Sequence, residues 1–264
     1  MDLKESETIK IMAYELIERH KNLISNQSFG NYSKSYEFYK RFSNIIKCFL
    51  QHTNKTKFCK VLDVGCGDGY HIFVINSLPD IKERTFFIGI DISPKDINIA
   101  TQTAISLSYG NINFINSSIE KINFPDSTFD IVLCNDVIEH IFLPQEFLIE
   151  IFKKLKSGGI LILTTPNDTS IIKRISNFIK RKKDYHGIND GHVSVKGVNE
   201  WKRILKKTGF KNIKIYRGAL VYGGNKINKH PVIFALIVLL DKFFDIIPFM
   251  KNWCESITFR CTKS

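Results

Sequence analysis

The chain has 264 residues, of which 44% are hydrophobic, and its 38 lysines and arginines outnumber 26 aspartates and glutamates to give a formal net charge of +12. This apolar fraction suits a packed core and excludes a disordered chain. The positive excess leaves open nucleic acid, an anionic membrane surface or an acidic substrate as partner, and a general drift of composition toward lysine explains it equally well.

The N-terminus and the cysteines indicate an intracellular protein. The opening residues, MDLKESETIK, are charged where a secretion signal would be apolar. No apolar run reaches the ~18 residues of a membrane span. The six cysteines form no CxxC pair, which predicts reduced thiols and neither disulfides nor a zinc site. We therefore expect a cytoplasmic protein.

Residues 1–57 are predicted to form helices that cap the rest of the chain. In 8–20, the residues Ile9, Met12, Leu16 and Ile17 share one helical face. Apolar residues in 36–50 recur at the same spacing, and the polar stretch 25–35 separates the two helices.

From residue 58 the pattern alternates between strand and helix. Strands are predicted at 59–64, 84–91, 112–116, 129–135, 158–166, 211–217 and 256–263. The helices between them are predicted at 70–77, 94–108, 144–155 and 197–210, the last ending at Gly209. Strands that are apolar on both faces indicate a parallel sheet covered by helices on both sides.

Gly65, Gly67 and Gly69 follow the first strand and open a helix. Missing side chains allow a sharp turn and a close approach of the backbone to a ligand. The second strand ends in Asp91, where a carboxylate can accept both hydroxyls of a ribose. Ser93, at the start of the next helix, is the better helix cap, which frees Asp91 for this role.

The spacing of the glycines separates two classes of nucleotide. Dinucleotide sites carry GxGxxG, but this chain has GxGxG followed by Tyr70. Asp63, just before the turn, would repel a pyrophosphate and would suit a ligand that carries an ammonium group. S-adenosylmethionine is the better fit.

Five motifs in order then resemble the class I S-adenosylmethionine-dependent methyltransferases, in particular the small-molecule branch with the ubiquinone-type O-methyltransferases. They are VLDVGCGDG, IGIDIS, FPDSTFDIVLCNDVIEHI, LKSGGILILTTPN and GHVSVKGVNEWKRILKKTGF, and they cover residues 58–216. The resemblance implies a three-layer, Rossmann-like α/β fold with a seven-stranded sheet, six strands parallel and the last antiparallel.

The resemblance also implies roles for residues in the cofactor site. Asp63, Gly65 and Gly67 would hold the methionine part, Asp91 the ribose, and the backbone at Asn135 would face the methionine end. Ser118 stands where the family usually has an acidic residue that reads the adenine amino group, and its hydroxyl is a weaker, neutral acceptor. The neighbouring residues that complete the predicted site are Cys66, Gly69, Ile92 and Ile119.

Catalytic groups are predicted in NDVIEHI, where Asp136, Glu139 and His140 would share one face of a helix. In ubiquinone-type enzymes the corresponding positions resemble a divalent-metal site. A capping box made by Asp136 and Glu139 needs no metal and is the favoured interpretation. His140 is the candidate general base. His186 and His192 follow the fifth strand and either would position or deprotonate an acceptor, or bond loop backbone instead.

Two insertions interrupt the pattern, at 166–195 and 217–255. The first carries a basic amphipathic stretch and the second an unbroken apolar run, so together they indicate either a lid or contact with an anionic membrane surface or lipid-like substrate. Nucleic acid is disfavoured because the basic cluster lacks aromatic stacking residues. The sequence does not predict the oligomeric state.

The chain as a whole, 1–264, is predicted to be one methyltransferase domain. It divides into a helical cap (1–57), a cofactor-binding core (58–216), an apolar helical insertion (217–255) and a last strand (256–264). The predicted activity is O-methylation of a small lipid-like, quinone or lipid-linked glycan acceptor by a cytoplasmic protein with possible membrane association. The alternatives are an N-methyltransferase, an RNA methyltransferase, or a scaffold that binds S-adenosylmethionine without catalysis.

Overall fold

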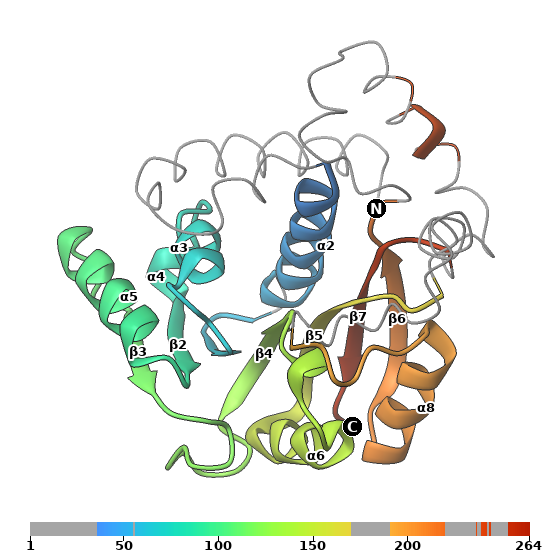
Figure 1. Ribbon diagram of the computed structural model, residues 1–264. Helices are drawn as coiled ribbons and strands as arrows, with labels where there is room; N and C mark the ends of the chain where they lie inside the picture. Colours follow the sequence, from blue (N-terminus) through green and yellow to red (C-terminus); the bar gives the residue numbers. More distant parts are fainter. Residues whose placement is uncertain are drawn as a thin grey trace.

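The computed structural model describes residues 36–54, 56–169, 191–219, 236, 239–241, 243 and 253–264. Within this part the chain forms a sheet between two layers of helices (Figure 1). The predicted helix at 8–20, His186 and most of both insertions lie outside the described residues.

The described residues form a seven-stranded sheet with the order β3-β2-β1-β4-β5-β7-β6. The strands are β1 (Cys59–Val64), β2 (Thr85–Asp91), β3 (Ile112–Asn116), β4 (Phe129–Asn135), β5 (Leu155–Pro166), β6 (Lys211–Arg217) and β7 (Ser256–Thr262). The pairs among β1 to β5 are parallel, and β7 runs antiparallel to both of its neighbours. The predicted arrangement of six parallel strands and one antiparallel strand is therefore confirmed.

The helices cover both faces of this sheet, as the apolar strands require. They are α2 (Tyr36–Thr53), α3 (Tyr70–Asn76), α4 (Ile81–Arg84), α5 (Pro94–Ser106), α6 (Pro144–Lys154) and α8 (Val198–Thr208), with the short 3-10 helix η2 (Ile138–His140). One core cluster joins the sheet to α2, α3, α4 and α5. A second cluster on the other face joins it to α6 and α8.

Local signals place these helix ends close to where the sequence predicts them. The Ser93 hydroxyl accepts a hydrogen bond from the Asp96 N–H at 3.3 Å and begins α5. Gly209 ends α8 in a left-handed conformation with φ of 109°. β5 begins three residues earlier than predicted, at Leu155, because Leu155 pairs with Phe129 at an irregularity in the ladder.

The carboxyl ends of the parallel strands form one edge of the sheet. Pro166 at the end of β5 is paired with Ser256 at the start of β7, and Arg217 at the end of β6 is paired with Ile257. Both insertions therefore leave the sheet at the edge where β1, β2 and β4 also end, which is where ligands bind in open α/β sheets.

All six cysteines are free and buried. Among the described residues, no helix is long and apolar enough to span a bilayer.

Candidate cofactor and acceptor site

The glycine turn after β1 is held by hydrogen bonds to β2. The N–H groups of Gly65 and Cys66 both donate to the Ile90 carbonyl oxygen, at 2.8 and 3.0 Å. The Gly67 N–H donates to Asp91 Oδ2 at 2.9 Å. These amides are occupied within the protein, so the turn offers few free donors to a pyrophosphate. This favours the prediction that the site is not one for dinucleotides.

The three glycines are needed for different reasons. All have positive φ, at 72°, 53° and 82° for Gly65, Gly67 and Gly69. A Cβ on Gly65 would lie 2.2 Å from Val137 Cγ2, and one on Gly69 would lie 2.6 Å from the Phe114 ring. A Cβ on Gly67 would meet nothing within 4 Å. Packing within the protein therefore excludes side chains at Gly65 and Gly69, where the sequence suggests the approach of a ligand.

Two carboxylates lie beside the turn. Asp63, in β1, is enclosed, and neither of its carboxylate oxygens has a hydrogen-bond partner. Burial, reinforced by the negative charge of Asp91, raises the pKa of Asp63 to about 8. Asp91 is more open and accepts N–H groups from Gly67 and Ser93 at 2.9 and 2.8 Å. A buried acid without partners is a place where a cationic ligand group would be favoured.

A pocket of about 420 Å³ opens between the ends of β1, β2, β3 and β4. The predicted site residues that line it are Gly65, Asp91, Ile92, Ser118, Ile119, Asp136 and His140. Ser118 follows β3 and His140 follows β4, so these two residues stand on opposite flanks of the crevice. The predicted residues outside its lining are Asp63, Cys66, Gly67, Gly69, Asn135, Glu139 and His192.

The predicted helix through Asp136, Glu139 and His140 is wrong. Asp136 is left-handed with φ of 54°, and only Ile138–His140 form a short 3-10 turn, whose first flanking residue is Val137 and which has no side-chain cap. The capping box is therefore wrong as well. The Asp136 N–H donates to the Thr164 carbonyl at 3.1 Å, and this long-range bond replaces the first turn of a helix.

Asp136 instead forms an ion pair that the sequence analysis missed. Nη1 of Arg41, from α2, donates to Asp136 Oδ1 at 2.8 Å and lies 2.7 Å from Oδ2, and the Arg41 side chain is only 7% exposed. A charge-assisted hydrogen bond between two side chains held at this distance is among the stronger polar contacts in a protein. The sequence does contain one sign that Arg41 has a special role. Arg41 interrupts the apolar helical face formed by Phe38, Phe42 and Ile45.

Glu139, His140 and His192 form a cluster whose possible ligand atoms lie within 4.8 Å of one another. Two of the three predicted metal candidates, Glu139 and His140, belong to this cluster. The third member is His192, and Asp136 is not part of it. Burial, and then the negative charge of Asp136, raises the pKa of Glu139 to about 8, and its Oε2 accepts a bond from the Thr165 hydroxyl at 3.4 Å.

His140 is oriented by the loop that follows the fifth strand. Its Nδ1 lies 3.0 Å from the Gly191 carbonyl oxygen, and its ring centroid is 4.8 Å from that of His192. Because a carbonyl only accepts, Nδ1 carries the proton in this bond, and Nε2 of a neutral ring is left as the basic atom.

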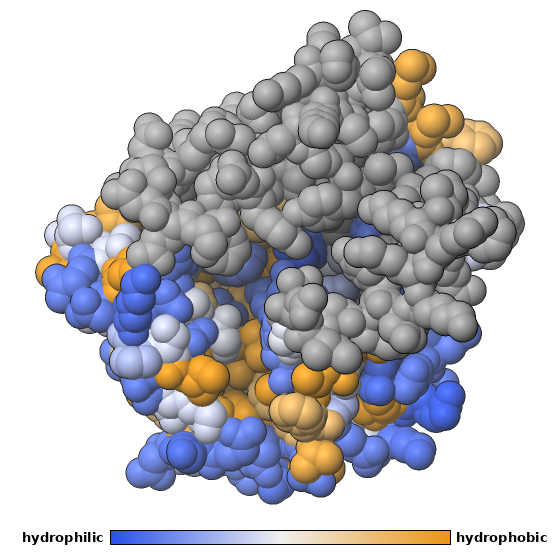
Figure 2. All heavy atoms as spheres, viewed as in Figure 1, coloured by the Kyte–Doolittle hydropathy of each residue, from blue (hydrophilic) through white to orange (hydrophobic). Residues whose placement is uncertain are grey.

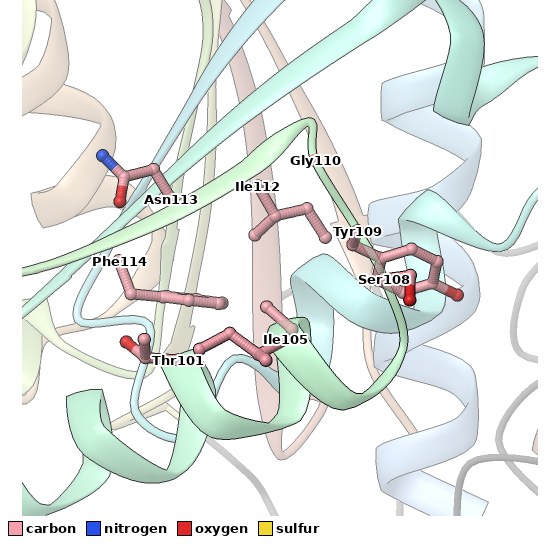
Figure 3. Close-up of a pocket in the computed structure, with 9 residues that line it drawn as sticks. Thr101, Ile105, Ser108, Tyr109, Gly110, Ile112, Asn113 and Phe114 are labelled. Atoms are coloured by element: carbon pink, nitrogen blue, oxygen red, sulfur yellow. The ribbon is translucent and has the colours of Figure 1, made fainter.

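A second hollow of about 480 Å³ lies between α5 and β3, away from the carboxyl ends of the strands (Figure 3). Ile105, Ile112 and Phe114 point toward it, and the residues that line it include no histidine and no charged side chain. The crevice at Gly65 and Asp91 is therefore the better candidate for chemistry.

A parallel sheet with an antiparallel β7, a glycine turn after β1 and a carboxylate at the tip of β2 together define the fold class of the class I methyltransferases. The sequence pattern described as "Methyltransferase domain" matches residues 55–212, and the chain belongs to that family.

Individual relatives agree on the family and differ in what they act on. The chain is 32% identical over 119 residues to the mitochondrial ubiquinone biosynthesis O-methyltransferase of Schizosaccharomyces pombe, covering 44% of this chain and 41% of that protein. It is 25% identical over 158 residues to the malonyl-[acyl-carrier protein] O-methyltransferase of Paenibacillus, covering 58% and 56%. The matched part thus spans about half the length of these relatives.

Among solved structures, a Haemonchus contortus phosphoethanolamine N-methyltransferase superposes with a TM-score of 0.59. It is 16% identical, and the match covers 94% of this chain and 56% of that one. At this identity the likeness shows the fold alone.

Proposed function

We propose that the protein transfers a methyl group from S-adenosylmethionine to a hydroxyl oxygen of a small, lipid-like acceptor. The observation that carries the proposal is the single crevice in which the glycine turn, Asp91 and Ser118 lie together with Asp136 and His140. The bound cofactor would supply the electrophilic methyl group and a good leaving group. The chain's own residues would bind and orient the cofactor and the acceptor, and would deprotonate the acceptor.

The residues present fit the cofactor. Asp91 keeps unused acceptor capacity beyond its two backbone bonds, which suits ribose hydroxyls. Ser118, which follows β3, would accept a hydrogen bond from the adenine amino group. Asp63 is a buried carboxyl without a partner, and an ammonium group nearby would stabilise its charged form.

His140 is the group best placed to take a proton from an acceptor. It lines the crevice, and its bond to Gly191 leaves Nε2 as the basic atom. Only an acceptor that must lose a proton, such as a hydroxyl, needs a base in this position. Arg41 would act by fixing Asp136 beside the same crevice.

The rim of the crevice favours an acceptor with an apolar part. Ile92 lines the crevice and is 78% exposed, and Phe142 and Leu143, which follow the lining residue Ile141, are 82% and 60% exposed. Large apolar side chains left in water at a ligand entrance are typical of contact sites.

The test is methyl transfer from S-adenosylmethionine that carries a tritiated methyl group to a solvent extract of membrane lipids. We expect labelled product together with S-adenosylhomocysteine, and mass spectrometry of the product identifies the acceptor atom. His140→Ala should lower turnover by about 10²–10⁴-fold, the usual contribution of a general base. Its affinity for S-adenosylmethionine, measured by calorimetry, should be unchanged.

His192→Ala is the companion variant, since His192 contacts the His140 ring but does not line the crevice. We expect it to have the smaller effect. Cofactor that binds but is never converted with any acceptor pool would support a scaffold instead of an enzyme. Undiminished turnover in His140→Ala would remove His140 as the base.

A further inference from the structure

The insertion between β6 and β7 presents a helical apolar face to solvent. Leu236, Leu239, Leu240 and Phe243 are helical and follow the spacing i, i+3, i+4, i+7, which places them along one side of a helix. Their exposed fractions are 55%, 64%, 55% and 60%. We call these four side chains the leucine face; Figure 2 shows apolar residues at the upper right, where this part of the insertion lies in Figure 1.

The outward orientation of the leucine face is fixed from the other side of the same helix. Asp241 is 1% exposed and forms ion pairs with Lys40 of α2 and with Arg217 at the end of β6. At 100° per residue, Asp241 points away from the four apolar positions. The buried charges therefore hold the leucine face toward solvent.

The same contacts connect the leucine face to the crevice. Lys40, which binds Asp241, is followed in α2 by Arg41, which binds Asp136 in the lining of the crevice. Two adjacent basic residues of α2 thus link the helix of the leucine face to the lining of the crevice.

Charge indicates what the leucine face meets. The chain carries a net charge of +12. An apolar helical side on a protein with a large positive net charge is typical of attachment to the interface of an anionic bilayer. A second copy would bring a second charge of +12 to the contact, and four side chains provide much less than the ~800 Å² per partner of a standard protein interface.

We propose that the leucine face docks the protein on the surface of an anionic lipid bilayer. The inference goes beyond methyl transfer and does not depend on it, because docking needs neither cofactor nor acceptor. It places the crevice at a membrane surface, where lipid-like molecules are presented.

Flotation with vesicles tests this proposal on the full chain. We expect the protein to float with vesicles made of equal amounts of phosphatidylglycerol and phosphatidylcholine at low salt, and much less with pure phosphatidylcholine. The double variant Leu239→Gln/Phe243→Gln should partition roughly a hundredfold more weakly, because two large apolar side chains no longer enter the lipid. Ile105→Gln is the matched control, since Ile105 is 65% exposed on α5, away from the insertion.

A wild-type protein that stays with neither kind of vesicle would overturn the proposal. So would a double variant that floats as well as the wild type, or an equal loss in Ile105→Gln. Light scattering after gel filtration tests whether a second copy of the chain covers the leucine face instead. If the wild type is a dimer and the double variant is a monomer that floats as well as the wild type, the leucine face serves self-association.

A second measurement does not depend on removing apolar residues. Phe243→Trp places an indole on the leucine face, and vesicles with brominated acyl chains quench an indole that enters the lipid. The variant and the protein it is compared with both carry Trp253→Phe, because Trp253 is 37% exposed and lies in the same insertion, and the remaining native tryptophan, Trp201, is buried. We expect strong quenching only in the protein with the added indole. Fluorescence that the brominated vesicles leave unchanged would contradict insertion of this face.

Discussion

Asp63 is a buried carboxyl group beside the glycine turn, and we expect its charge to respond to a cation bound nearby. With its pKa raised to about 8 by burial and by Asp91, it holds a proton at pH 7 when no cation is near. An ammonium group in the crevice would stabilise the ionised form. We therefore predict that binding of S-adenosylmethionine at pH 7 releases close to one proton. Calorimetry in two buffers of different ionisation enthalpy measures this number directly.

Asp63→Asn tests whether the released proton comes from Asp63, since asparagine keeps the shape of the side chain but has no carboxyl proton. It should bind the cofactor without proton release. Between about pH 4 and 8, the native wild type without cofactor keeps a proton on Asp63 that the unfolded chain has already lost. Its stability should therefore fall by up to ~1.4 kcal/mol per pH unit as the pH rises through this interval. The variant should lack that slope. Equal proton release in both proteins would contradict the role of Asp63.

Arg41 shows what the sequence can and cannot reveal at the scale of one residue. Its position on the apolar face of a predicted helix marks it as unusual, since charged residues are rarely buried unless paired. Its partner, Asp136, is 95 residues further along the chain, and no local pattern connects the two. Asp91 and Gly65, by contrast, belong to a short motif with fixed spacing, and they do line the predicted crevice.

At the scale of the element, the turn after β1 depends on Gly65 more than on Gly67. Both have positive φ, but only at Gly65 would an added Cβ meet a neighbour, Val137, at 2.2 Å. We predict that Gly65→Ala destabilises the fold by several kcal/mol, whereas Gly67→Ala costs about 1–2 kcal/mol for its backbone conformation alone. Urea unfolding of both variants measures the difference.

The neighbour can be tested directly. Val137→Ala removes the two methyl groups nearest to the added Cβ, so Gly65→Ala/Val137→Ala should recover part of the stability that Gly65→Ala loses. Equal losses in the two single glycine variants would show that backbone strain, and not contact with Val137, governs the turn.

The strands were predictable because most are apolar on both faces and bounded by turn residues. β1, β3, β4 and β6 have the predicted bounds. The conformation of the segment after β4 was not predictable from the sequence. Its residue spacing suggests a helix, but distant partners determine its conformation. Thr164 binds the Asp136 backbone and Arg41 binds its side chain, and these tertiary contacts replace helical hydrogen bonds.

At the scale of the whole molecule, periodicity predicts a covered sheet but does not order its strands. The antiparallel last strand followed from resemblance to a family, and the pairing of β7 between β5 and β6 confirms it. This placement explains why two insertions that are distant in sequence leave from the same edge. Their apolar composition was visible in the sequence, but the buried anchor Asp241 was not, because its partners lie in α2 and β6.

Asp241 should therefore stabilise the whole molecule more than an ordinary ion pair. Burial opposes its ionisation, but Lys40 and Arg217 outweigh burial and hold its pKa below the usual range. Asp241→Leu leaves two cations buried without this partner, so we predict a loss of about 3–5 kcal/mol in urea unfolding at pH 7.

Glu150→Leu makes the same change in net charge at a surface pair with Lys153, where the two side chains are 30% and 49% exposed, and should cost less than about 1 kcal/mol. Because the pKa of Asp241 is lowered on folding, its contribution is present above the unfolded value near 4 and is lost as the pH falls below it. The difference between wild type and Asp241→Leu should shrink accordingly in acid. A difference that persists there, or equal losses in the two variants at pH 7, would mean that packing of the insertion, and not the buried charge, fastens it to α2 and β6.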